Sequence, residues 1–267
     1  MDGHTLQVLE YDKVKEVLSR LAASELGRQA VLNLTPKAQL EAVRTELKQV
    51  SEMKEVLAAS SVPLSDRVKD LAPLLRKSSF EGSRLSEEEL LSVAYTMRSA
   101  RLTREFLEKR GETCPNLLSL SLAIRPCPEL EERVSSAIDE SGRIRDTASE
   151  TLRGLRSLKR KVELKVKEAL ESIIQANRGA IQEPVITMRD DRYVIPVKSG
   201  DREKIEGVVH DLSATRATVF LEPLAVLEAN NELKRVGLEE RGEEKRILKE
   251  LTSLLRKEAE AVRETME

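Results

Sequence analysis

Two glycines near the C-terminal end of the chain have the spacing of a phosphate-binding loop. In such a loop, backbone amides surround the phosphates, and a lysine followed by serine or threonine contacts phosphate and Mg²⁺. Gly237 and Gly242 have this spacing, but Glu243 and Glu244 stand where the lysine and the hydroxyl residue are required. Two carboxylates would repel a nucleotide, and the surrounding pattern is helical. We therefore expect this chain neither to bind nor to hydrolyse ATP.

Histidine and cysteine, which could carry acid–base, nucleophilic or metal chemistry, are scarce in this sequence. His210 precedes Asp211, but adjacent side chains of a strand point to opposite faces, so His210 is predicted to be a packed or hydrogen-bonded strand residue. His4 is distant in sequence, and Cys114 and Cys127 each precede a proline and form no cluster. We expect no catalytic residue, no metal, and a reducing cytoplasmic location. No stretch approaches the roughly 20 apolar residues of a membrane helix, so no membrane partner is expected.

Basic side chains remain as the group that could bind a ligand. The chain has 45 basic and 47 acidic residues and a net charge of −2, which excludes a global positive field but not a local patch. Residues 178–222 are also nearly balanced, so a phosphate contact there requires cations that cluster on one face. If this segment binds nucleic acid, the candidate cations are Arg189, Arg192, Lys198, Lys204 and Arg216, and an ordinary solvated surface is the alternative.

Two of these cations flank a predicted tight turn. Asp190-Asp191 joins two strand patterns and would make Arg189 and Arg192 close cross-strand neighbours. Like charges in that position repel each other unless an anion lies between them, which is an argument for a bound phosphate. The two aspartates could neutralise the pair instead. We expect both arginines to be exposed, so that replacing them with glutamate would leave the fold intact.

The periodicity of apolar residues predicts the elements that carry the cations. Residues from Ala148 to about Asn177 follow a helical repeat, and a second helical pattern runs from Pro223 to the end, with a weak point or bend expected at Gly237 and Gly242. Between the helices the period changes to two. Four short antiparallel strands are predicted there, at residues 185–188, 193–197, 205–212 and 218–221.

The charges of the two long helices have opposite signs. The first helix carries an excess of basic residues and the second an excess of acidic ones. Such charges are typical of helices that complement each other side by side, although a stripe that faces phosphates is the other interpretation. A strand insert that begins and ends at one place requires antiparallel helices. The predicted fold is mainly α, with a helical core bundle and a long antiparallel two-helix stalk that carries a small antiparallel β-rich tip.

The first half of the chain reads as short helices. Hydrophobic residues make up 40% of the sequence, aromatic residues 2% and charged residues 34%, a balance typical of long helices with much solvated surface. One amphipathic helix is predicted to end near Gly27, and a second is predicted to open at Thr35 and to break at Pro63. Ser86 with Glu89 three positions later forms a predicted capping box at the start of a further helix.

Several sequence blocks together resemble a known family. The most specific blocks are Gly207-Val208-Val209-His210-Asp211, Ala217-Thr218-Val219-Phe220-Leu221-Glu222-Pro223 and Asn230-Asn231-Glu232-Leu233. Others are Leu9-Glu10-Tyr11-Asp12, Arg145-Asp146-Thr147-Ala148-Ser149 and Tyr193-Val194-Ile195-Pro196-Val197-Lys198. This set resembles the bacterial MutS paralogue that lacks the mismatch-reading domains, the second MutS type. The resemblance extends from near Leu6 to near Leu255.

The resemblance implies that the chain consists of four structural regions. It implies a helical core at residues 1–147, an ascending lever helix at 148–178, a β-rich clamp insert at 179–222, and a descending lever helix at 223–267 that leads toward an ATPase domain absent from this sequence. In that family the ATPase domain dimerises and uses ATP and Mg²⁺, and a C-terminal Smr endonuclease domain usually follows. The resemblance therefore implies an excised N-terminal portion of a parent that forms homodimers, with a naturally shortened relative as the alternative. In either case we expect no enzymatic activity and no cofactor in this chain itself.

The family also suggests partners. Its members are associated with branched DNA and the suppression of homologous recombination, and with binding and splitting collided ribosomes, so branched DNA or ribosomal RNA is expected here. The alternative is a coiled-coil structural spacer with a protein–protein interaction tip. The sequence departs from the family pattern at Leu212, where glutamine is usual, and at Arg216, where glycine is usual. Arginine tolerates a positive φ poorly, so the loop conformation at Arg216 is in doubt.

Overall fold

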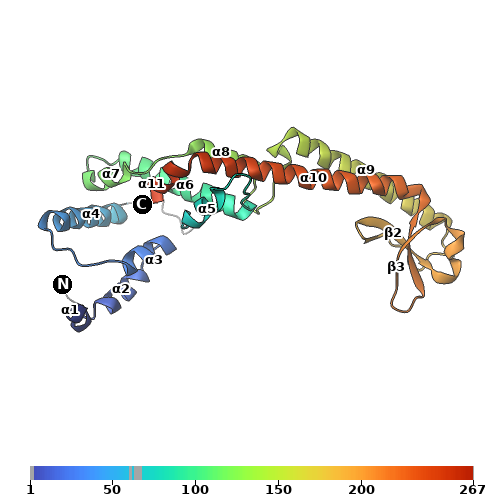
Figure 1. The fold of residues 1–267 in the computed structure, drawn as a ribbon, viewed down its shortest axis with the longest axis horizontal. Coiled ribbons are helices and arrows are strands. Elements are labelled where there is room, and N and C mark those ends of the chain that lie inside the picture. The colour runs from blue at the N-terminus through green and yellow to red at the C-terminus, as the bar shows by residue number, and fades with distance from the viewer. Residues whose placement is uncertain (1–2, 60–61, 63–67, 267) are drawn as a thin grey trace. The chain divides into compact units, whose positions relative to one another are not determined.

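The computed structural model describes residues 3–59, 62 and 68–266. Over these residues the protein is mainly helical and contains one antiparallel sheet of four strands, so the predicted fold class is confirmed at this level. The chain divides into two compact units, whose elements are labelled in Figure 1. The first unit consists of the residues up to Arg145 and those from Ile247 onward, and the second is Asp146–Arg246. In the described part of the chain, no helix has both the length and the apolar character needed to cross a bilayer.

The N-terminal residues form several short helices, so the prediction of one helix up to Gly27 is wrong. The helices are α1 (Gly3–Val8), α2 (Tyr11–Ser19) and α3 (Glu25–Leu32). Glu10 interrupts the helical pattern because its φ of 50° is left-handed, and Ser24 starts α3 by accepting a hydrogen bond from the amide of Gly27. The apolar repeat continues across both interruptions, which is why periodicity alone predicted a single helix.

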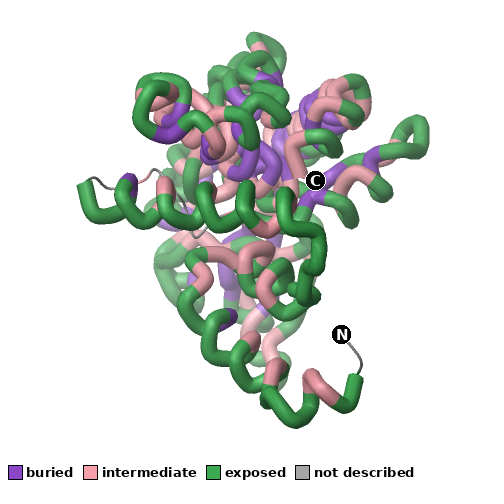
Figure 2. The backbone as a smooth tube through the Cα atoms, turned by 90° about the vertical axis from the view of Figure 1, so that its left-hand side faces the viewer, coloured by how far each residue is buried: buried purple, intermediate pink, exposed green. Residues whose placement is uncertain are grey.

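The next helix, α4 (Leu40–Ala59), begins later than the expected opening at Thr35. The predicted break at Pro63 lies outside the described residues. Within 3–59 only Ser19 and Val56 are buried, and the backbone near the N-terminus is green and pink in Figure 2. Val56 packs with Leu107, Cys114 and Leu117, which joins the C-terminal part of α4 to α6 and α7.

In the rest of the first unit, the helices begin where the prolines and the capping box predict. Its helices are α5 (Ala72–Ser78), α6 (Glu87–Glu108), α7 (Pro115–Ser121) and α8 (Pro128–Ala137). The capping box is confirmed: the Ser86 hydroxyl accepts from the Glu89 amide at 3.2 Å, and the Glu89 carboxylate accepts from the Ser86 amide at 2.7 Å. Prolines occupy the first turns of α5, α7 and α8, where no helical amide is needed.

In the second unit, a long helix packs against a small antiparallel sheet, and the two share one hydrophobic core. A short 3₁₀ turn (Asp146–Ala148) precedes α9 (Glu150–Ala176). The strands are β1 (Thr187–Arg189), β2 (Arg192–Lys198), β3 (Gly207–Leu212) and β4 (Thr218–Pro223), in the spatial order β1-β2-β4-β3. A 3₁₀ segment, η2 (Ser199–Lys204), connects β2 to β3. Val166 and Leu170 of α9 pack with Ile195 of β2 and Leu221 of β4, and all four are fully buried.

Tight backbone packing fixes the pairing of β3 with β4. A Cβ atom at Gly207 would lie 2.4 Å from the carbonyl oxygen of Glu222, so only glycine fits this position. The pairing then shifts by one residue between Val209 and Asp211, which leaves His210 in a bulge. A bulge redirects the side chains that follow it.

The final long helix, α10 (Leu224–Lys257), continues without a break through Gly237 and Gly242, where a weak point or bend is expected. Glycine costs roughly 1 kcal/mol relative to alanine in a helix interior. Packing offsets this cost, because Leu233 and Val236 are buried beside the first glycine. The helix ends instead at Lys257, and α11 (Ala259–Met266) follows.

Candidate nucleic-acid interface

The hairpin between β1 and β2 has the predicted geometry. Asp190 and Asp191 both adopt left-handed conformations, with φ of 50° and 62°, as a two-residue turn of the mirror-image type requires. Arg189 is directly opposite Arg192 in the register of the two strands. The prediction that these arginines are cross-strand neighbours is confirmed. Their side chains, however, have separate anionic partners within the protein.

Arg189 is held over the sheet. Its Nε donates to a carboxylate oxygen of Asp211 at 3.0 Å, and a terminal nitrogen donates to the hydroxyl of Thr187 at 3.0 Å. The guanidinium carbon lies 3.9 Å from the centre of the Phe220 ring, a favourable cation–π contact. Arg189 therefore joins β1 to β3 and β4, and much of its hydrogen-bonding capacity is already used.

Arg192 is a structural residue, and the expectation that it is exposed is wrong. Its side chain is 17% exposed, and it donates to the Glu222 carboxylate at 2.7 Å and to the Asn231 side-chain oxygen at 2.6 Å. Glu222 is fully buried. A glutamate at position 192 would place a second carboxylate beside that buried one, so the fold is not expected to tolerate the substitution unchanged.

Glu222 is the centre of a buried polar network that the sequence analysis did not identify. Besides the bond from Arg192, its carboxylate accepts a hydrogen bond from the side-chain amide of Asn230 at 2.8 Å. Its other oxygen lies 2.6 Å from Nε2 of His210. Asn230 also bonds to both the backbone amide and the carbonyl of Tyr193. His210 is thus a hydrogen-bonded strand residue, as predicted. The available signal was a charged residue inside the apolar run of β4, which needs a buried partner.

The other three candidates lie toward the opposite end of the sheet. Lys198, at the end of β2, pairs with Thr218 at the start of β4, and its amine donates to the Gly179 carbonyl at 2.8 Å. Lys204, in η2, forms an ion pair with Asp201 at 2.7 Å, and its side chain is 64% exposed. Arg216 is exposed in the turn between β3 and β4. The structure therefore separates the five candidates into two groups.

The turn at Arg216 keeps a left-handed conformation despite the arginine. Its φ is 58°, and its amide donates to the carbonyl of Ser213 at 2.8 Å. Further bonds close the turn: the Ser213 amide donates to the Thr218 carbonyl at 2.9 Å, and the Ser199 hydroxyl donates to the Arg216 carbonyl. The surrounding hydrogen bonds hold this backbone in place, and the arginine side chain extends from it into solvent. Within the described residues, neither Lys198 nor Arg216 forms an ion pair.

The basic residues of α9 have partners on α10. Arg156 bonds to Glu240 at 2.9 Å and to Glu244 at 2.7 Å, and Lys159 bonds to Glu240 at 2.6 Å. Burial opposes ionisation of Glu240, but the bonds from Lys159 and Arg156 outweigh it and hold the pKa of Glu240 below its ordinary value. These contacts join the first half of α9 to late positions in the second-unit part of α10. For these cations the complementary-helix interpretation is supported, and a phosphate-facing role is not.

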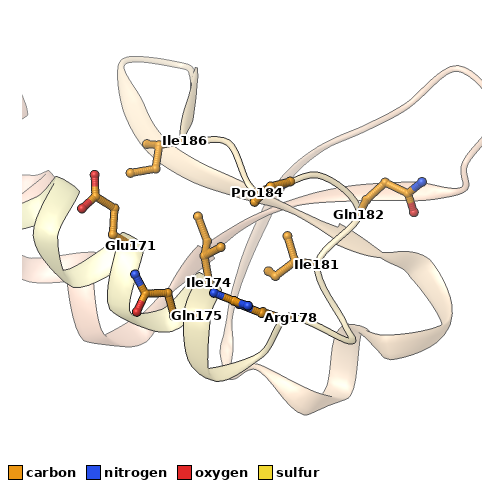
Figure 3. A pocket seen from close by; sticks show the side chains of 8 residues that line it. All are labelled: Glu171, Ile174, Gln175, Arg178, Ile181, Gln182, Pro184 and Ile186. Carbon is orange, nitrogen blue, oxygen red and sulfur yellow. The ribbon is translucent and has the colours of Figure 1, made fainter.

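A depression opens near the C-terminal end of α9. It has a volume of about 790 Å³ and is lined by residues of α9 and of the segment that leads into β1 (Figure 3). Aliphatic side chains, among them Ile174, Ile181 and Ile186, form much of its lining, and Gln175 and Arg178 contribute polar groups.

Metal ligands and reactive thiols give no further site. Among the described residues, no three or more His, Cys, Asp or Glu side chains are grouped to hold a metal ion. Cys114 and Cys127 are both unpaired and buried. Burial, with a smaller contribution from Glu258, raises the pKa of the Cys127 thiol to about 11, so this sulfur is a poor nucleophile near neutral pH.

Several known proteins with similar sequences are named endonuclease MutS2. The chain is 39% identical over 255 residues to the endonuclease MutS2 of Pelotomaculum thermopropionicum, which covers 95% of this chain and 32% of the relative. It is 37% identical over 273 residues to endonuclease MutS2 of Geobacillus sp. strain WCH70, and the aligned region covers 100% of this chain and 35% of the relative. The chain is a homologue of the MutS2 proteins. It spans about a third of the length of these relatives. No protein-family model matches it.

Proposed function

We propose that this MutS2 homologue is the lever-and-clamp portion of a MutS-like ATPase that grips branched DNA or the ribosome. In this proposal, residues 1–147 form a helical core, 148–178 and 223–267 form the two lever helices, and 179–222 form the clamp. The relatives' name describes endonucleases, of which this chain matches about a third, and we propose no catalytic role for this chain itself. ATP, Mg²⁺ and the homodimer interface would belong to a separate ATPase domain.

One observation supports a nucleic-acid contact at the tip. Lys198 and Arg216 have no ion pair within the described residues, and the Ser199 side chain bonds to the Arg216 backbone, which brings the two segments together. Phosphate contacts of this kind fix the position of a protein without reading bases. We propose that these two cations, with Lys204 nearby, contact the backbone of the nucleic acid. Arg189 and Arg192 are assigned to the fold instead.

An experiment that removes both cations tests this assignment. Lys198→Glu removes one cation, and Arg216→Gly removes the other while keeping a residue that accepts a left-handed φ. Arg133→Glu is the matched control, because Arg133 is exposed on α8 in the first unit and has no ion pair within the described residues. Each lost phosphate contact lowers the slope of log K against log salt by about 0.9 on duplex DNA. The combined Lys198 and Arg216 variant should therefore bind a four-way junction more weakly, with a slope shallower by about 2.

The opposite result would favour a second function. Apolar side chains are also exposed on this part of the chain: Val185, Met188, Val208 and Leu212 are each more than 40% exposed. Such residues suit a protein contact, as in a coiled-coil spacer with an interaction tip. If the double variant binds junctions and ribosomes as the unmodified chain does, with the same salt slope, the spacer function is favoured. Self-association that depends on Val208 and Leu212 and needs no nucleic acid would support it directly.

A further inference from the structure

The depression at the end of α9 combines a fixed apolar floor with a polar rim. Ile174 and Ile181 are 7% and 5% exposed and belong to the core cluster of the second unit, and Ile186 packs against that cluster. The floor is therefore held by the fold. The volume of about 790 Å³ lies within the range of small-ligand sites, roughly 300–1,000 Å³.

The rim carries hydrogen-bonding groups of both kinds. Figure 3 shows Glu171 and Gln175 on α9 at one side of the depression, with Arg178 just beyond the end of the helix and Ile186 across from them. A carboxamide donates and accepts, a carboxylate accepts, and a guanidinium binds phosphate. The hydrogen-bonding edge of a nucleobase also mixes donors and acceptors, and its flat faces are apolar. The exposed rim groups can bond to such an edge, whereas an apolar protein side chain would use none of them.

The depression lies next to one of the proposed phosphate-binding cations. The Lys198 amine donates to the carbonyl of Gly179, the residue after Arg178. Backbone bonds reinforce the link, because the Lys198 amide donates to Ala180 and the Gln182 amide donates to Pro196, both at 2.9 Å. Arg178 itself forms no ion pair within the described residues. A nucleotide in the depression would thus have a cation beside its pocket and another at the adjoining strand end.

We propose that this depression binds an unpaired nucleobase, so that the tip prefers nucleic acid with an extrahelical or single-stranded nucleotide over a continuous duplex. The proposal rests on the proposed function and specifies the substrate of the same tip. Ile174, Ile181 and Ile186 would contact the faces of the base, Gln175 and Glu171 its polar edge, and Arg178 and Lys198 the neighbouring phosphates. Branch points and RNA loops provide such nucleotides, because their bases leave the stack at little cost.

The test compares two DNA duplexes that differ by one nucleotide. One contains a single unpaired 2-aminopurine, and the other is fully paired. The full chain should bind the first about tenfold more tightly, within the range of one inserted base, and the 2-aminopurine fluorescence should rise as it leaves the stack. Gln175→Ala changes an exposed helical residue to the best helix former, so it should preserve the fold while lowering this preference toward one. Ser172→Ala, at an exposed position of α9 outside the depression, is the matched control.

The outcomes separate this inference from the proposed function. Lys198→Glu with Arg216→Gly should weaken binding of both duplexes and reduce the tenfold preference much less than Gln175→Ala does. If the chain binds both duplexes equally, or if Gln175→Ala and Ile186→Ala keep the full preference, the pocket does not hold a base and only the proposed function stands. If Ile186→Ala impairs ribosome binding but changes neither the DNA measurements nor the binding of a single-stranded RNA, the depression contacts a ribosomal protein and the inference is wrong. If no nucleic acid binds, the proposed function fails and the inference fails with it.

Discussion

Removing the Glu222 carboxylate should destabilise the sheet of the second unit more than any other single polar substitution there. Glu222 is fully buried and accepts hydrogen bonds from Arg192 and Asn230, and His210 contacts its second oxygen. These partners lie on β2, β3 and α10, while Glu222 lies on β4. Glu222→Ala would remove one acceptor from a mostly buried guanidinium, together with its compensating charge, and one acceptor from the buried Asn230 side-chain amide.

The size of the effect follows from what remains buried. Breaking a buried ion pair by removing one partner costs about 3–5 kcal/mol, because the other charge loses its compensation. Arg192 keeps its bond to Asn231 and is 17% exposed, so water can reach part of it, and this limits the cost. We expect a loss of about 3 kcal/mol, a large fraction of the 5–15 kcal/mol that stabilises a typical domain. Glu222→Gln preserves the shape and one acceptor oxygen, so it should cost less.

Hydrogen exchange measured by mass spectrometry is the suitable assay, because a chain with two compact units need not unfold in one step. Peptides from β2 and β4 should lose protection by the predicted amount, while α6 should remain unchanged. Glu228→Ala, at an exposed position of α10, is the control and should stay within about 0.5 kcal/mol of the unmodified chain. Unchanged protection of β2 and β4 in Glu222→Ala would refute the reasoning that this network holds the sheet together.

Two further predictions concern the helices of the second unit. A hydrogen bond from Arg246 lowers the pKa of Glu243 from 4.5 to about 2. The ionised carboxylate therefore stabilises the fold above about pH 4.5, and this contribution is lost as the pH falls toward 2. Glu243→Gln should make the stability depend less on pH in this window, as measured by acid unfolding followed with circular dichroism. Cysteines at Lys159 and Glu240 should be joined by a short bismaleimide, because these side chains meet at 2.6 Å, whereas cysteines at Lys159 and Glu228 should not. Crosslinking of only the second pair would contradict the antiparallel order of these helices.

Local signals in the sequence were sufficient for most of the secondary structure. The capping box at Ser86 and the turn at Asp190 are set by residues a few positions apart, so their geometry follows from local chemistry. The prediction of a single N-terminal helix was wrong for the converse reason. A left-handed Glu10 gives no signal in an apolar repeat, and the packing that preserves α10 at Gly237 depends on residues brought together by the fold.

The candidate interface was harder to predict because ion pairing is a property of the tertiary structure. The sequence shows Arg192 as one cation among several beside two aspartates, and nothing local indicates that its partner is thirty residues away on β4. Glu222 carried the available signal as a charged residue in a strand of buried neighbours. Reading that signal requires knowing that β2 and β4 are adjacent, which sequence periodicity does not specify.

The separation of the two groups of cations determines how mutational data on this tip should be interpreted. At one end, Arg189 and Arg192 are neutralised by Asp211 and Glu222, so their substitution changes the stability of the sheet before it changes any surface charge. At the other end, Arg216 extends from a backbone that its neighbours hold in place, so its substitution changes charge with little effect on packing. Loss of nucleic-acid binding in an Arg192 variant is therefore evidence about folding. Arg216 reports on phosphate contact most directly, because its charge can be removed while the backbone that presents it is retained.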